Sequence, residues 1–339
     1  MTNHCRSLFK RPGRLGFTMI EILVVLGIIG LLVTLLVTAM APSLENARIA
    51  ATKSIIAQVD QQLQRRMMAF NAIDEDLQKV AEAVKANWPA GPSVPVIKVL
   101  IKENRYLAAF PQRVQDLFGM DGAIGGSNPF TADAPLLNVV WKNYLDENKA
   151  PLSSLTDLAL PQHRARISSS ELIYLQLTQG NSLGTETYSL DGISSTYITD
   201  EDGDGLMEIR DAWGNELWFY NAPTSLFPRD SDNRILLNQG ARILFSSIPG
   251  DNGQDTVESG ELFFDPFDKL GRTSNYIDTN KQFYHRNTYF SFLIVSAGPD
   301  RSHGLREPNT EENIPAQYLR LASPLSLDEL FDNITNRQQ

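Results

Sequence analysis

Cysteine and histidine are scarce in this chain, and their scarcity narrows the chemistry that the sequence supports. The single cysteine among 339 residues, Cys5, cannot form a disulfide within the chain, so packing or a bound metal must stabilise the fold. The four histidines, at positions 4, 163, 285 and 303, do not have the spacing of a metal site. No nucleophile elbow and no phosphate-binding glycine loop occurs in the sequence. We therefore expect a protein that is not an enzyme.

Positive charge is concentrated at one end of the chain. The formal net charge at pH 7 is −10, and the only charged residues before Phe17 are Arg6, Lys10, Arg11 and Arg14. Removing these four positive charges leaves −14 for the remainder. A nucleic-acid-binding head would need a basic face, so we expect no nucleic acid as a partner. An acidic body is compatible with divalent cations.

Residues 17–41 form an almost unbroken apolar run that is long enough to cross a bilayer as a helix. The positive charges before the run predict that the leader, residues 1–16, stays in the cytoplasm and that the rest is exported. One carboxylate, Glu21, lies within the run, and at membrane depth it is costly unless it finds a partner. We interpret Glu21 as a residue of assembly within the membrane.

Two interpretations of the leader are open on these grounds. An ordinary secretory signal is cleaved after its apolar stretch, at small residues. Here the favoured cleavage site precedes the stretch, between Gly16 and Phe17. The alternative is an uncleaved signal anchor, and the apolar run by itself does not separate the two.

Residues 16–21 read Gly-Phe-Thr-Met-Ile-Glu, and this segment resembles the processing motif of type IV pilins and type II secretion pseudopilins. The resemblance implies that prepilin peptidase cuts after Gly16 and methylates the new amine of Phe17. Glu21 would be the fifth residue of the processed chain, and the resemblance implies that it pairs with the terminal amine of a neighbouring subunit. Physically, a carboxylate in hydrocarbon seeks a cation, and an ammonium at the same depth supplies one.

The resemblance also implies where the protein resides and what it contacts. The expected location is the inner, cytoplasmic membrane, crossed once, with an extracytoplasmic C-terminal head that joins a filament after assembly. The expected partners are prepilin peptidase, other pilin or pseudopilin subunits and an inner-membrane assembly platform. The expected fold is α+β, with a long N-terminal helix packed on a small antiparallel β-sheet head and a largely helical insertion.

Beyond the apolar run, Pro42 predicts a bend or a short unwound stretch. Apolar residues then recur every three or four positions, a helical period, and place Leu63, Met67 and Phe70 in the core. The pattern ends before Pro89, since a residue preceding proline avoids the helical region. The expected parts are a leader (1–16), a transmembrane helix (17–41), an amphipathic stalk helix (42–88), a mixed, mainly helical insertion (89–190) and a β-rich head (191–335).

Shorter elements are predicted from local signals. Ser168 and Glu171 form a capping-box pattern that opens a helix, and Gly180 is its expected stop. The stretch 325–334 is expected to be a short helix, with the final residues frayed. The remaining expectations are helices at 97–109, 113–118 and 137–145, and strands at 217–220, 242–248, 261–264 and 289–295.

Residues 200–211 match the spacing of a twelve-residue calcium loop. Acidic residues occupy positions 1, 3, 5, 9 and 12 of the loop, Gly205 occupies position 6 where the backbone must turn, and the residue at position 7 offers its backbone carbonyl. The candidate ligands for Ca²⁺ are Asp200, Asp202, Asp204, Leu206, Glu208 and Asp211.

Other interpretations of this loop stay open. A solvated acidic turn would also use Asp-Gly pairs, and Asp211 has a second role available as a cap near Trp213. Position 12 is aspartate where a bidentate glutamate is usual, and the flanks do not have the pattern of two amphipathic helices. We therefore expect an isolated loop, similar to those of dockerin-type modules, rather than a complete EF-hand.

Two segments of the expected head resemble the major pseudopilin of type II secretion. Residues 211–214, Asp-Ala-Trp-Gly, resemble its motif at the entry to the first strand of the sheet. Residues 296–300, Ser-Ala-Gly-Pro-Asp, partly resemble its C-terminal calcium loop, although Arg301 replaces a glycine. Whether Ser296 and Asp300 form a second calcium site is therefore open.

These patterns predict a structural subunit of a pilus-like filament whose head is stabilised by calcium. The alternative belongs to another class: a membrane-anchored extracytoplasmic binding protein or enzyme that does not polymerise. Glu21 distinguishes the two, because a simple anchor has no use for a carboxylate within its span. A secretion pseudopilus, a pilus and a DNA-uptake filament all remain compatible with the sequence, as do a major and a minor subunit, and the size of the head favours a minor or specialised one.

Overall fold

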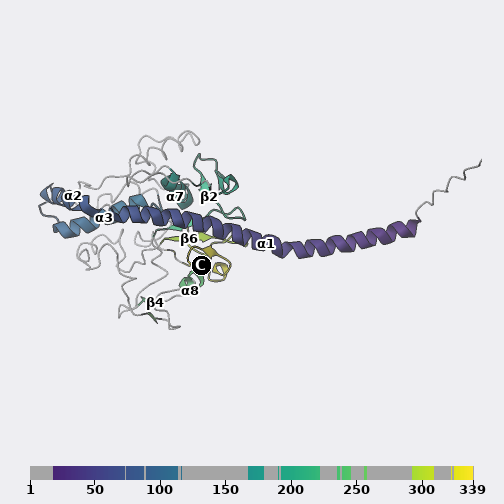
Figure 1. Ribbon diagram of the computed structural model, residues 1–339. Helices are drawn as coiled ribbons and strands as arrows, with labels where there is room; N and C mark the ends of the chain where they lie inside the picture. Colours follow the sequence, from purple (N-terminus) through teal and green to yellow (C-terminus); the bar gives the residue numbers. More distant parts are fainter. Residues whose placement is uncertain are drawn as a thin grey trace, which may run out of the picture. The chain divides into compact units, whose positions relative to one another are not determined.

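Figure 1 shows the computed structural model, an α+β arrangement of long helices and small antiparallel sheets. It describes residues 18–72, 74–87, 89–113, 116, 167–178, 190, 192–221, 235–236, 239–245, 256–257, 292–308, 322 and 324–338. The protein divides into two compact units, Met1–Ala47 and Arg48–Gln339. The predicted α+β class is confirmed.

Helix α1 spans Met19–Ala72 and contains Pro42. Of the two alternatives predicted at Pro42, a bend or a short unwound stretch, the unwound stretch does not occur, because one missing N–H removes a single hydrogen bond and the turns on either side continue the helix. The most apolar 18-residue window of α1 has a mean hydropathy of 2.9, and none of it is buried within the protein. By length and composition α1 is able to cross a membrane.

In the second unit, α1 contributes one face to the main hydrophobic core. Ile55, Val59 and Leu63 follow one another at helical spacing and are at most 3 % exposed. Leu63 and Phe70 are buried and Met67 packs against the same cluster, so all three predicted core positions are confirmed.

The predicted stalk segment is helical on both sides of residue 73, as the end of α1 and as α2. Helix α2 (Asp74–Asn87) packs against α3 (Val94–Ala109), and the two share their own apolar cluster, which includes Ala81 and Ile97. The described residues from 42 to 72 and from 74 to 87 are helical, as predicted for the stalk, and the helix predicted at 97–109 is confirmed. The hairpin of α2 and α3 buries the apolar stripe of 77–84.

The central sheet has three antiparallel strands in the order β3-β6-β7. Strand β3 (Trp218–Tyr220) pairs with β6 (Leu293–Ser296), which pairs with β7 (Ile334–Thr335). All four residues of β6 are buried, and Ile294 lies in the same core cluster as the second half of α1, which runs past β6 in Figure 1. The predicted strand at 217–220 is confirmed, as is the described end of the strand predicted at 289–295.

Two smaller strand pairs and three further helical elements lie before β6 in the sequence. Strand β1 (Ile198–Thr199) pairs with β2 (Glu208–Ile209), and β4 (Ile235–Leu236) pairs with β5 (Thr256–Val257). The helical elements are α7 (Ser169–Thr178), the short 3₁₀-helix η2 (Ser195–Tyr197) and α8 (Gln239–Leu244).

Two predictions in the C-terminal half are wrong. The strand expected at 242–248 begins as helix α8, because Ala241, Leu244 and Phe245 have helical spacing and are buried together. The helix expected at 325–334 is a 3₁₀-helix, η6 (Asp328–Leu330), followed by β7, because pairing with β6 satisfies the backbone there.

The expected fraying of the C-terminal residues is also wrong up to residue 338. The Arg337 guanidinium donates to the carbonyl of Phe292, and Asn336 is 5 % exposed. The predicted strand at 261–264, the helix at 137–145 and most of the helix at 113–118 lie outside the described residues.

Candidate functional site

The acidic segment predicted to bind calcium forms the connection between β1 and β2, and it is folded around its own carboxylates. The Asp200 carboxylate accepts hydrogen bonds from the N–H groups of Gly203 at 2.7 Å and Gly205 at 3.0 Å. Both glycines have positive φ, +74° and +86°, a conformation that glycine adopts without strain. The Asp202 carboxylate accepts from the N–H of Asp204, and the Asp204 carboxylate accepts from the N–H of Leu206. The sharp turn predicted at Gly205 is therefore present.

Four of the predicted ligands and one additional residue gather into two groups of carboxylates. Within each group the candidate ligand atoms all lie within 4.8 Å of one another. The groups are Asp200 with Asp202 and Glu208, and Glu171 with Asp202 and Asp204. Asp202 belongs to both, so the two groups adjoin.

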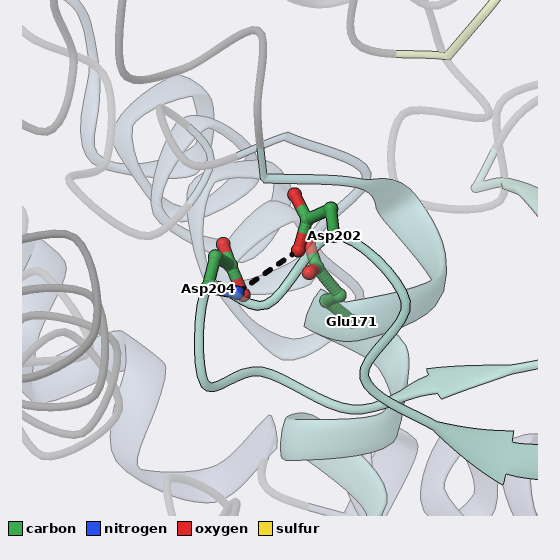
Figure 2. A group of neighbouring side chains, drawn as sticks. All are labelled: Glu171, Asp202 and Asp204. Carbon is green, nitrogen blue, oxygen red and sulfur yellow. Dashed lines mark hydrogen bonds between the residues drawn. The ribbon is translucent and has the colours of Figure 1, made fainter.

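Glu171 reaches the loop from the first turn of α7 (Figure 2). The predicted capping box is present, because the N–H of Ser168 donates to the Glu171 carboxylate and the N–H of Glu171 donates to the Ser168 hydroxyl at 3.2 Å. The next two serines fix this turn against the sheets. The Ser169 hydroxyl accepts from the N–H of Phe219 at 3.0 Å, and the Ser170 hydroxyl accepts from the N–H of Ile209 at 2.8 Å.

Burial dominates the electrostatics of these carboxylates. Glu171 and Asp204 are 1 % and 0 % exposed, and burial raises the pKa of both, with repulsion from neighbouring carboxylates adding to the effect. Burial also raises the pKa of Glu208 to about 8, although its carboxylate accepts from the N–H of Glu201. One oxygen of Asp204, Oδ2, is buried and accepts no hydrogen bond within the described structure.

The residue types fit a hard divalent cation. Ca²⁺ takes several oxygen ligands from carboxylates and backbone carbonyls, and both groups consist of carboxylates. A cation would also supply the buried Asp204 oxygen with a partner. Leu206, predicted to contribute its carbonyl, has a fully buried side chain in the same turn.

Asp211 lies apart from both groups and takes the alternative role. Its Oδ1 accepts from the N–H groups of Trp213 and Asn215, and its Oδ2 accepts from the Ser296 hydroxyl at 2.7 Å. The carboxylate therefore caps the turn at 213–215 and ties it to the end of β6, rather than facing the acidic loop. The physical reason is that N–H and hydroxyl donors already occupy both oxygens of this buried carboxylate.

The open second calcium site at Ser296 and Asp300 receives no support from the described residues. The Ser296 hydroxyl donates to Asp211, and the Asp300 carboxylate accepts from the N–H of Ser302 at 2.8 Å. Among the described residues, neither belongs to a carboxylate group of the kind found at the acidic loop. The turn is instead closed by local hydrogen bonds, including one from the N–H of Gly298 to the Ser296 hydroxyl.

At the N-terminal end of the described structure, Thr18 and Glu21 cap α1. The Glu21 carboxylate accepts from the N–H and the hydroxyl of Thr18, at 2.7 Å and 2.8 Å, and the Glu21 N–H donates to the same hydroxyl. This is a second capping box. The predicted cleavage residues, Gly16 and Phe17, lie outside the described residues.

Comparison with known families decides what this N-terminus is. Residues 11–37 match the family model described as the prokaryotic N-terminal methylation motif. The protein has a prepilin-type N-terminus. Together with the apolar helix α1, this match supports the pilin and pseudopilin family. The comparisons with curated proteins and with solved structures gave no match.

The match to the prepilin motif ends at residue 37, so the family is supported by the N-terminus and not by the head. The motif implies processing by prepilin peptidase and assembly with other pilin subunits, and with α1 it indicates a membrane-anchored pilin-like protein.

The sequence does not identify Glu171 as a residue of the candidate cation site. Glu171 was assigned only to a capping box, because nothing in the local sequence connects it with residues 200–208. The available signal was a glutamate followed at once by an apolar run, Leu172-Ile173, which indicates a carboxylate at the edge of the core.

Proposed function

We propose that this protein is a structural subunit of a pilus-like filament, a type IV pilin-like protein or type II secretion pseudopilin. It is cut after Gly16 by prepilin peptidase, anchored by α1 in the inner membrane and assembled through that helix. The observation that carries the proposal is the N-terminal methylation motif at residues 11–37, which includes the apolar start of helix α1.

Two properties of the first unit support assembly through α1. The large apolar side chains from Met19 to Val37 are all at least 50 % exposed within the protein, so they need lipid or neighbouring subunits around them. Glu21 lies in this exposed stretch, where burial in hydrocarbon favours a cationic partner. The freshly cut amine of Phe17 on the next subunit is such a partner.

The proposal includes calcium bound by the head. The ligands proposed within the acidic loop are Asp200, Asp202, Asp204, Glu208 and the carbonyl of Leu206. Calcium binding would stabilise the folded head, because a ligand that binds only the native state raises its stability. The extracytoplasmic location assigned to the head would expose the loop to that ion.

Cleavage at Gly16 is the decisive experiment for the proposed class. Gly16→Ala, co-expressed with prepilin peptidase, is expected to accumulate at full length, whereas the wild type is converted to a form that begins with methylated Phe17. Mass spectrometry of the purified protein distinguishes the uncleaved N-terminus from the processed one.

Gly30→Ala is the matched control for this experiment. It makes the same change within the apolar helix, at a position where an added Cβ meets no atom within 4 Å, so its processing should equal that of the wild type. Processing of Gly16→Ala at the wild-type rate, or a wild type that keeps its leader, would exclude a prepilin and favour a simple membrane anchor.

A further inference from the structure

We propose that Glu171, from the first turn of α7, is a ligand of the cation in the acidic loop, so that the cation joins α7 to the connection between β1 and β2. The inference rests on the calcium binding proposed for the head and is independent of filament assembly. It adds a ligand from outside the twelve-residue loop and gives the cation a role in tertiary structure.

The first argument is position. Ligand atoms of Glu171, Asp202 and Asp204 lie within 4.8 Å of one another, and Figure 2 shows Glu171 projecting from the helix toward the two aspartates of the loop. Glu171 is 1 % exposed and Asp204 is 0 % exposed. Two carboxylates have therefore been removed from water and placed side by side, an arrangement that is costly unless a positive charge lies between them.

The second argument is an oxygen with no hydrogen-bond partner. Asp204 uses Oδ1 to accept the N–H of Leu206, while its buried Oδ2 accepts no hydrogen bond within the described structure. Buried carboxylate oxygens in folded proteins nearly always have a partner. A cation coordinated by Oδ2 and by Glu171 would supply that partner.

The third argument is the charge of the surroundings. Besides Asp204, the acidic side chains of Glu208 and Glu216 repel a negative charge on Glu171. The basic side chain that follows the acidic loop, Arg210, pairs with Glu201 and donates to the carbonyl of Gly214. Within the described part of the protein, no ion pair supplies Glu171 or Asp204 with a basic partner.

The fourth argument is that the helix is held in place before any ion binds. The Ser170 hydroxyl accepts from the N–H of Ile209 and donates to its carbonyl, which fixes the first turn of α7 on β2. Glu171 therefore faces the loop without a rearrangement of the helix. The proposed ligands are carboxylates from two segments, one of which is a glycine-rich turn. Such a set suits Ca²⁺ better than Mg²⁺, because Ca²⁺ tolerates irregular coordination geometry whereas Mg²⁺ requires a near-ideal octahedron.

Glu171→Gln tests the inference directly. The amide oxygen of glutamine can still accept the N–H of Ser168, so the cap of α7 is retained while the charge is removed. Ser168→Ala is the matched control, because it removes the hydroxyl of the capping box and leaves the carboxylate. The full-length protein is purified in detergent, stripped with a chelator and titrated with calcium chloride by calorimetry, and thermal unfolding is followed by circular dichroism with and without calcium.

The expected result is a Kd for calcium that rises at least about tenfold in Glu171→Gln, with loss of most of the calcium-dependent rise in Tm. Ser168→Ala should lower the Tm without calcium and bind calcium with a Kd within about twofold of the wild type. A folded Glu171→Gln protein with the wild-type Kd would overturn the inference and leave the calcium proposal intact. Should Glu171→Gln not fold, Glu171→Asp, which keeps the charge on a shorter side chain, is judged by the same criterion.

The remaining outcome concerns the wild type. If the full-length protein binds no calcium at millimolar concentration, both the calcium proposal and the role of Glu171 fall, and a shared proton neutralises the buried pair. That result leaves the filament proposal untouched, because the proposal is tested separately by cleavage at Gly16.

Discussion

The Glu21 carboxylate caps α1 in the described structure and would have a second role in the proposed filament. In the isolated subunit it accepts two hydrogen bonds from Thr18 and caps α1, at the positive end of the helix dipole. In the proposed filament it pairs with the terminal amine of a neighbouring subunit. The first use needs only an acceptor oxygen, whereas the second needs a negative charge, so a substitution that separates the two can tell which one matters.

Glu21→Gln keeps the acceptor and removes the charge. We expect it to lower the yield of filaments roughly tenfold or more, because losing one partner of a buried ion pair costs about 3–5 kcal/mol. The yield is measured in the sheared-filament fraction of cells that express the complete assembly machinery, with cleavage at Gly16 confirmed beforehand.

Glu45→Gln removes the same charge from α1 outside the apolar run and serves as the control for Glu21→Gln. It should assemble as the wild type does. If Glu21→Gln also forms filaments at the wild-type level, capping explains the glutamate, and the proposed pair between subunits is wrong.

Among the elements, α7 shows how a short helix can organise two sheets. Its first turn places three consecutive polar residues in the protein interior: Ser169 accepts from β3, Ser170 exchanges two hydrogen bonds with Ile209 of β2, and Glu171 faces the acidic loop. The folded protein uses these first-turn side chains as connectors to neighbouring elements, and Glu171 also caps the helix by accepting the N–H of Ser168.

Ser170→Ala removes a single oxygen atom, but we expect it to destabilise the head more than so small a change suggests. The substitution leaves the buried N–H of Ile209 without its acceptor, and an unsatisfied buried donor costs about 1–3 kcal/mol. Urea unfolding of the full-length protein in detergent, followed by circular dichroism, measures the change in the free energy of unfolding.

Ser54→Ala is the control for Ser170→Ala. It removes an exposed hydroxyl that bonds the side chain of Gln58, and its effect should stay within about 0.5 kcal/mol. Equal effects of the two substitutions would show that the contact between Ser170 and β2 does not contribute to stability.

Across the second unit, an aromatic cluster connects helices to the sheet. Phe70 of α1, Tyr106 of α3, Phe110 and Phe292 have ring centroids 4.7–6.5 Å apart along their successive contacts. These residues come from three distant parts of the sequence, so their contact closes the core around β6. Aromatic pairs at such distances add a specific attraction to the burial of their apolar surface.

Phe292→Ala should lower the free energy of unfolding by about 3–5 kcal/mol, since it opens a cavity at the centre of this cluster. Phe331→Ala is the matched control, because Phe331 is 72 % exposed while Phe292 is 1 % exposed. Both variants are compared with the wild type by urea unfolding. A loss in Phe331→Ala as large as that in Phe292→Ala would contradict this assignment of the core.

The errors at 242–248 and 325–334 share one cause. The segment at 242–248 is rich in branched residues, which favours a strand. In the structure it begins as α8, which buries Ala241 and Leu244 in one cluster with residues of β6 and with Leu305. The segment at 325–334 ends as β7 because its backbone pairs with the edge of β6. In both cases a neighbour that is distant in sequence outweighs local propensity.

Conclusions that depend on contiguous residues needed no coordinates. The cleavage motif, the apolar span with Glu21 and the turn around Gly205 each lie within a few residues or a single helix, so spacing along the sequence is enough to define them. The partners of Asp211 and Glu171 are different. Ser296 lies next to Asp211 because β6 pairs with β3, and Glu171 lies next to Asp204 because α7 packs on β2. The roles of these two carboxylates depend on segments that are distant in sequence. A carboxylate that is buried away from water needs a hydrogen-bond or ionic partner, and the tertiary structure determines which partner is near it.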